Sequence, residues 1–145
     1  MPLAAVLLSI GSIPSKLLLC FSLFMVIAYS APPFRFKEKP FLDSFTSSCH
    51  FVTPLLYGVL LAGGRLSNLV LVVLAYFTWG MASHAFGSVQ DVPFARKAGI
   101  GSIATVIGSA LTVRFSAIAY VVAALLVIIA FPTVLGIGGA AVFCT

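Results

Sequence analysis

The chain has 145 residues, of which 61% are hydrophobic and 8% are charged, and its formal net charge is +5. Soluble domains carry charged residues at about 25% of positions, so this composition excludes an ordinary soluble domain. Eight lysines and arginines also make no nucleic-acid-binding footprint, and they indicate membrane topology or an anionic ligand instead.

The apolar runs are continuous or helical in period, which favours helices over the short alternation of an outer-membrane barrel. The sequence therefore predicts an integral membrane protein of the all-α class. We expect one membrane domain over residues 1–145, a polytopic bundle of about four to six membrane helices that each need about 20 apolar residues.

Two apolar runs begin the chain. Residues 2–13 are too few for a full crossing, whereas residues 17–29 almost cross a bilayer if Lys16 extends its amine to the interface. Pro14 lies between the runs, so the alternative is one long helix kinked at that proline.

Residues 30–43 form the first polar loop. Pro32 and Pro33 disfavour a helix and favour an extended chain. Side chains of an extended chain alternate, so three cations are expected to point the same way: Arg35, Lys37 and Lys39. The loop is either a positive anchor at the membrane surface or a clamp for a phosphate group.

A third run covers residues 44–63 and has a polar first half. Ser44 is a candidate N-cap, Pro54 is expected to bend the helix, and His50 either lines a cavity or hydrogen-bonds between helices. A glycine turn then leads to a fourth run over residues 66–88.

The most informative stretch is residues 79–101, where polar groups interrupt an apolar helix. Helical spacing places five small or polar residues on one face: Gly80, His84, Gly87, Ser88 and Asp91. We expect this face to border a cavity. Arg96 and Lys97 follow in a second polar loop over residues 91–101, so the stretch favours a site for a metal-bound phosphate.

The rest of the chain reads as a short helix over residues 103–108, a spanning run over 110–131, and an apolar tail over 134–145. Two spanning runs separate the two polar loops, so both loops emerge on one side of the membrane. They carry most of the cations, and the positive-inside bias places them in the cytoplasm, where they would share one mouth.

Two segments resemble a known family. YSAPPFRFKEKPFLDSFTSSCHF is similar to the Tyr-Ser-x-Pro-Pro-x-Arg-x-Lys loop of UbiA-type intramembrane prenyltransferases. HAFGSVQDVPFARKAGIGSIATVIG resembles their second aspartate-rich motif and the segment after it. The sequences of both segments are most similar to the lycopene elongase branch, which makes C50 carotenoids.

The resemblance implies a helical bundle around a cavity that opens to the cytoplasm and to lipid. It implies that Mg²⁺ binds a prenyl diphosphate, whose allylic group is transferred to a hydrophobic acceptor such as lycopene. Asp91 would be the metal-binding catalytic residue. Four cations would bind the diphosphate: Arg35, Lys37, Arg96 and Lys97. Tyr29 and Asp43 match flanking positions without an assigned role, and the membrane would be the cell's plasma membrane.

The chain departs from the family pattern in three ways. Ala95 stands where the second motif has another aspartate, and the first aspartate-rich motif would precede Met1. A final helix also has no counterpart, so the chain resembles the later part of such an enzyme.

Three functions therefore stay open: an active prenyltransferase, an inactive fragment or subunit that needs a second chain for the first motif, and a small transporter. Transport sites usually place an ionisable group near the membrane centre, at a cost of about 2.5–3.5 kcal/mol. The acids here lie in or beside the loops, which counts against transport.

Overall fold

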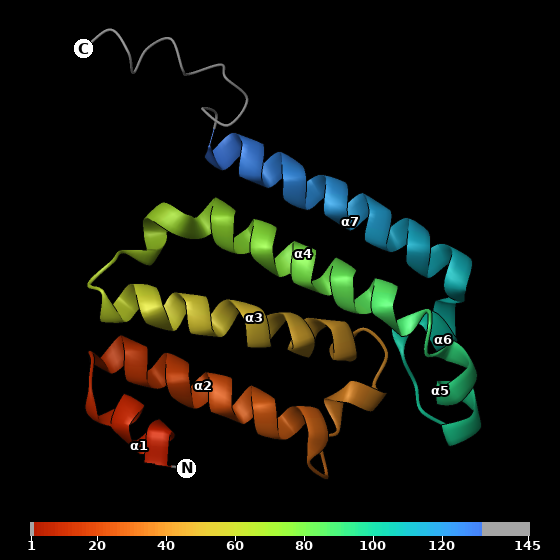
Figure 1. The fold of residues 1–145 in the computed structure, drawn as a ribbon, viewed down its shortest axis with the longest axis horizontal. Helices are drawn as coiled ribbons and strands as arrows, with labels where there is room; N and C mark the ends of the chain where they lie inside the picture. The colour runs from red at the N-terminus through yellow and green to blue at the C-terminus, as the bar shows by residue number, and fades with distance from the viewer. Residues whose placement is uncertain (1, 132–145) are drawn as a thin grey trace, which may run out of the picture.

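The computed structural model describes residues 2–131, and the predicted apolar tail over 134–145 lies outside this range. The described residues are helical and contain no strand (Figure 1). The elements are α1 (Pro2–Ser9), α2 (Ile13–Ser30), η1 (Phe36–Glu38), α3 (Leu42–Leu61), η2 (Leu66–Leu69), α4 (Val70–Ser88), α5 (Val92–Ala98), α6 (Ile103–Ile107) and α7 (Ser109–Ala130).

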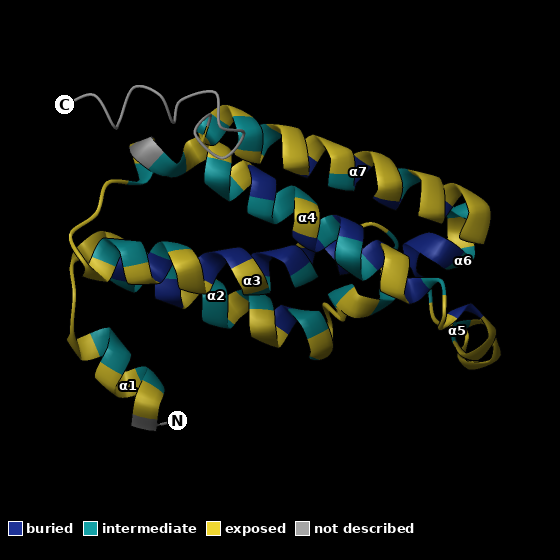
Figure 2. Ribbon diagram, turned by 45° about the horizontal axis from the view of Figure 1, so that its top comes forward, coloured by how far each residue is buried: buried dark blue, intermediate teal, exposed yellow. Residues whose placement is uncertain are grey.

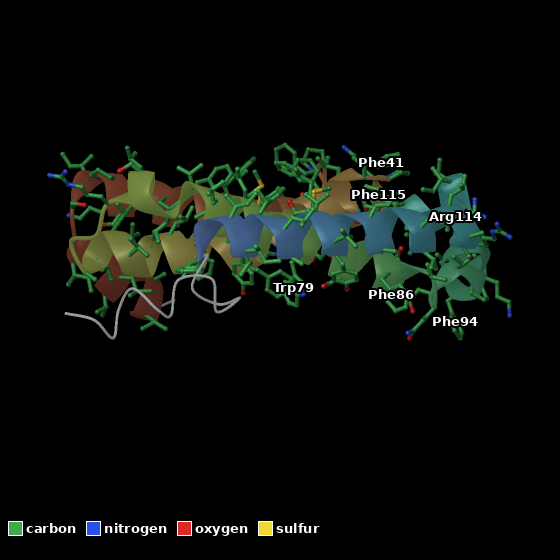
Figure 3. All side chains as sticks on the ribbon, turned by 90° about the horizontal axis from the view of Figure 1, so that it is seen from above. Phe41, Trp79, Phe86, Phe94, Arg114 and Phe115 are labelled. Carbon is green, nitrogen blue, oxygen red and sulfur yellow. The ribbon has the colours of Figure 1, made fainter. Side chains whose placement is uncertain are left out.

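Four long helices lie side by side in the order α2, α3, α4 and α7 (Figure 1). The main contacts between them join α2 with α3, α3 with α4, and α4 with α7. The view from above shows that they form a layer, with Trp79, Phe86 and Phe94 on one side of it and Phe41 on the other (Figure 3). The predicted helical membrane fold is confirmed, with its helices arranged as one layer in this part of the chain.

Three of these helices, α2, α4 and α7, are long and apolar enough to cross a membrane. Many of their outward side chains are exposed, including Leu17 and Ile118 at 66% each, as expected for surfaces that meet lipid tails (Figure 2). The α3 helix differs because its buried face is partly polar and includes Ser44, Thr46 and Ser48. It lies between α2 and α4, so its hydroxyl groups face protein rather than lipid.

The α1 helix is a separate short element. A turn at Gly11, whose φ is +84°, separates it from α2, and Pro14 lies in the first turn of α2, where proline is tolerated. The alternative of one long helix kinked at Pro14 was therefore wrong. The Tyr57 hydroxyl of α3 donates a 2.7 Å hydrogen bond to the Leu7 carbonyl and ties α1 to the layer.

The contact between α3 and α4 depends on Gly80. A Cβ atom added at this glycine would lie 2.6 Å from Ser48 Oγ and 3.3 Å from Ser48 Cα, so the two helices approach too closely for any side chain. The Ser48 hydroxyl donates a 2.5 Å hydrogen bond to the Phe77 carbonyl at the same contact. Gly80 was expected to open a cavity, and that expectation was wrong because the glycine packs against α3.

The first polar loop is folded rather than extended. The amides of Phe34 and Arg35 both donate to the Ala31 carbonyl at 3.1 Å, and η1 follows directly. The predicted alternation therefore fails. Arg35 pairs with Glu38, whereas Lys39 Nζ lies 5.4 Å from the centre of the Phe36 ring.

Two other local predictions also need correction. Helix α3 begins at Leu42, so Ser44 lies within its first turn and is not the N-cap. The second polar loop contains a helix, α5, which ends at Ala98 and is capped by Gly99 in the left-handed conformation with φ +67°. The helix stops there because glycine adopts this conformation without steric cost.

Candidate functional site

A cavity of about 380 Å³ lies at the end of the layer where both polar loops are found. It is lined by side chains from α2, the first loop, α3, α4 and α5, and from the segment that precedes α6. Figure 1 shows the first loop and α5 at this same end of the layer. The sequence predicted that the two loops share one mouth, and they do line one cavity.

The two loops also touch one another. A Cβ atom added at Gly101 would lie 2.8 Å from the Glu38 carbonyl oxygen and 3.2 Å from Pro40 Cδ. Only glycine allows the backbone that follows α5 to approach the first loop this closely. Gly101 therefore helps to bring the residues of the two loops around the same cavity.

Asp43 is buried in the wall of the cavity, with an exposed fraction of 1%. Its Oδ1 accepts a 2.7 Å hydrogen bond from the Ser44 amide, and its Oδ2 lies 3.4 Å from the Ile103 amide nitrogen. The carboxylate thus connects the first turn of α3 with that of α6. Sequence reasoning assigned no role to Asp43, although an acid is rare in this chain.

His84 lines the cavity from α4, as its position on the predicted face indicated. Its Nδ1 lies 3.2 Å from Ser44 Oγ, and its Nε2 lies 3.3 Å from the Tyr29 hydroxyl. One nitrogen of a neutral imidazole donates a hydrogen bond and the other accepts one, so both contacts can be satisfied together. The ring therefore joins α2, α3 and α4 at the cavity wall.

His50 has a different environment. Its ring packs edge-on against the Tyr29 ring, with 5.3 Å between the ring centres. It does not line the cavity, and its Nε2 is buried without a hydrogen-bond partner among residues 2–131. Neither of the two roles considered for His50 is therefore seen in the described part of the chain.

The structure brings together two of the five predicted site residues. Lys37 from η1 and Asp91, which directly precedes α5, both line the cavity and are exposed. The other three are not among the lining residues. Arg35 is exposed and paired with Glu38, whereas Arg96 and Lys97 are exposed in the last turn of α5.

The carboxylates of the cavity decide which metal site is possible. Within residues 2–131, no group of three or more His, Cys, Asp or Glu side chains is arranged to hold a metal ion. Asp91 is exposed, Asp43 is buried, and Glu38 is paired with Arg35. Protein-bound Mg²⁺ often takes one or two carboxylates and completes its shell with phosphate oxygens and water. The residues therefore fit a magnesium ion held together with a diphosphate, and do not fit a metal centre built from this protein segment alone.

Fold and site together define a helical membrane protein whose apolar helix layer has, at one end, a cavity lined by both charged and apolar side chains. The UbiA prenyltransferase family matches the sequence over residues 1–145, and the chain belongs to this family. The resemblance drawn from the two loop motifs is thereby confirmed. No solved structure matches the chain.

Several similar proteins of known name indicate which branch of the family the chain resembles. The chain is 46% identical over 127 residues to "Lycopene elongase/hydratase" of Corynebacterium glutamicum, covering 87% of this chain and 44% of the relative. It is 47% identical over 132 residues to "C(50) beta-cyclic carotenoids biosynthesis protein LbtBC" of Dietzia sp., covering 90% and 31% respectively. A "Lycopene elongase/hydratase" of Haloferax volcanii is 34% identical over 101 residues, covering 70% and 33%. The chain thus spans less than half the length of these relatives.

Proposed function

We propose that the chain takes part in Mg²⁺-dependent transfer of an allylic prenyl group from a prenyl diphosphate to a hydrophobic acceptor. The observation that carries this proposal is the shared cavity, in which the cation Lys37 and the carboxylate Asp91 come from different loops. Family membership supports the reaction class. The names of the relatives support lycopene as the acceptor.

The reaction requires a bond to break and a charge to be stabilised. The bond between the allylic carbon and the diphosphate oxygen breaks, and its electron pair stays on the diphosphate. A double bond of the acceptor then supplies the electrons of the new carbon–carbon bond, and the acceptor loses a proton. Bound Mg²⁺ would neutralise charge on the leaving diphosphate, and cations placed there act in the same direction.

The residues of the cavity suit the two ends of such a substrate. Asp91 would hold the metal, and Lys37 would face the diphosphate, with Arg35, Arg96 and Lys97 contributing from the rim. Tyr29 and Phe94 line the same cavity, and the faces of aromatic rings attract a positive charge. The allylic group would therefore lie near one of these two rings.

The location of the site in the cell is part of the proposal. We place residues 1–145 as one membrane domain in the plasma membrane, with the cavity open to the cytoplasm. The support is the charge distribution, because both cationic loops lie at the cavity end of the layer, whereas the turn between α3 and α4 contains one cation, Arg65.

A transfer assay tests the proposal directly. Membranes containing the chain are incubated with radiolabelled dimethylallyl diphosphate and lycopene, with Mg²⁺ or with a chelator. We expect labelled carotenoid only with Mg²⁺. The absence of product with Mg²⁺ would reject activity of this chain alone.

A second candidate function is a subunit that needs another chain, or an inactive fragment. It is favoured by the arrangement of the metal-ligating side chains, since the described residues contain no group of three or more His, Cys, Asp or Glu that could hold a metal ion. Co-expression with a segment that carries an aspartate-rich motif distinguishes these cases. Product that forms only after co-expression identifies a split enzyme, whereas no product in either case identifies an inactive chain.

The contribution of Lys37 gives a graded prediction. We expect Lys37→Gln to raise the KM for the prenyl diphosphate by about fivefold to tenfold, because a charged hydrogen bond contributes about 1.5–3 kcal/mol and exposure weakens it. Arg65→Gln, a charge removed at the other end of the layer, is the matched control and should leave KM unchanged. An equal effect of both variants would show that only the overall charge matters.

A further inference from the structure

The inference concerns Asp43, which the proposed function leaves without a role. Asp43 and Asp91 are the two aspartates of the whole chain, and both line the same cavity although 48 positions separate their numbers, 43 and 91. Asp91 is exposed, whereas Asp43 is 1% exposed. A buried carboxylate in a membrane protein is costly unless it is paired, so Asp43 requires a physical reason.

The hydrogen bonds of Asp43 compensate its charge only in part. An ionised carboxylate offers about four lone-pair sites. The 2.7 Å bond to the Ser44 amide is of normal length, but the 3.4 Å separation between Oδ2 and the Ile103 nitrogen exceeds the usual range of about 2.7–3.2 Å. Oδ2 thus retains most of its capacity to accept a further partner.

No cation of the described chain meets this need. Within residues 2–131, the only ion pair joins Arg35 and Glu38. Lys37 lines the same cavity as Asp43 but makes no ion pair with it. Asp43 lies in the wall of the 380 Å³ cavity, so a cation that enters this cavity with an anion would lie beside a carboxylate that has no ion-pair partner within residues 2–131.

We infer that Asp43 is the second carboxylate ligand of the divalent cation that enters this cavity with a diphosphate. The inference rests on the proposed function. Asp91 and Asp43 would supply the one or two carboxylates that Mg²⁺ takes when phosphate oxygens complete its shell. Ala95 also lines the cavity, one helical turn after Asp91, and so offers a position at which a replacement carboxylate can be introduced.

The test measures binding rather than catalysis, with Mn²⁺ in place of Mg²⁺ and inorganic pyrophosphate as the probe. The full chain is purified in detergent, and Mn²⁺ binding is followed by electron paramagnetic resonance. Asp43→Asn keeps an oxygen for the Ser44 amide but removes the charge. We expect it to weaken pyrophosphate-dependent Mn²⁺ binding about tenfold or more. Metal-free pyrophosphate binding should not weaken, because the substitution removes a negative charge that repels the anion.

The double variant Asp43→Asn with Ala95→Asp is the decisive control. If Asp43 is a ligand, the new carboxylate should restore Mn²⁺ binding to within about threefold of the parent, a difference well below the effect of losing a ligand. If Asp43 only connects α3 with α6, the double variant stays weak while thermal unfolding shows an intact fold, and the inference is overturned. An equal loss of metal-free pyrophosphate binding overturns it as well.

A second measurement uses the unaltered chain and does not depend on how the variants fold. Aspartate labelled with ¹³C marks only two side chains, so infrared difference spectra on addition of Mn²⁺ and pyrophosphate should show shifts of two carboxylate bands. A shift of one band overturns the role of Asp43 alone. Failure of the parent to bind Mn²⁺ with pyrophosphate overturns the proposed function and this inference together.

Discussion

Replacing Asp91 with alanine is expected to reduce prenyl transfer by at least about 100-fold, a loss typical of removing one group that stabilises transition-state charge. Asp91 is the exposed carboxylate of the cavity, and it would hold the metal against the leaving diphosphate. Its removal leaves the diphosphate to the lysine and arginine side chains. The measurement is the initial rate of labelled carotenoid formation in membranes that contain equal amounts of each variant.

Gln90→Ala provides the control for the Asp91 variant. Gln90 is the preceding residue, is exposed and carries no charge, so its truncation should change the rate less than about twofold, as expected for surface substitutions. A parent-like rate for Asp91→Ala would show that the carboxylate does not hold the metal. Similar losses for both variants would point to the local backbone instead.

The second large effect is on stability. Gly80→Leu should lower the free energy of unfolding by about 2–3 kcal/mol, because overpacking a tight contact has this magnitude. The new side chain would collide with Ser48, whose Cα lies 3.3 Å from the position of an added Cβ. It would also disturb the hydrogen bond from Ser48 to the Phe77 carbonyl. Reversible unfolding of the purified chain in mixed micelles, followed by circular dichroism, measures the change.

Gly87→Leu is the matched control, since it makes the same substitution in the same helix. No atom lies within 4 Å of a Cβ added at Gly87, and this glycine is exposed. We expect little change or a small gain, because leucine has a higher helix propensity than glycine by less than about 1 kcal/mol. Equal destabilisation by both variants would refute the close contact between α3 and α4.

Much of the fold follows from hydropathy. The long apolar runs predicted α2, α4 and α7, and the short apolar stretch over residues 103–108 predicted α6. The loops were less predictable, because their shape depends on particular hydrogen bonds. Prolines in the first loop favour an extended chain, yet two amides bond to the Ala31 carbonyl and fold it into a turn. The second loop was predicted as irregular because it contains charged residues, but part of it forms the short helix α5.

The cavity was predictable only in outline. The sequence predicted that His84 and Asp91 share one site with Lys37. That prediction needed only the helical period and the side of the membrane on which each loop emerges. The contact between Asp43 and Ile103 joins residues 60 positions apart, and no local pattern indicates it. The close approach at Gly80 was likewise hidden, since a glycine in a helix can border either a cavity or a neighbouring helix.

The arrangement of the long helices has a consequence for biogenesis. Each of them packs mainly against the long helix that precedes or follows it in the chain, and the contact between Tyr29 of α2 and His84 of α4 is an exception at the cavity end. Local contacts of this kind favour fast assembly. During translation, each newly inserted helix can therefore dock on the previous one as it leaves the translocon. The cavity forms only later, when the residues after α5 have been synthesised and can pack against the first polar loop.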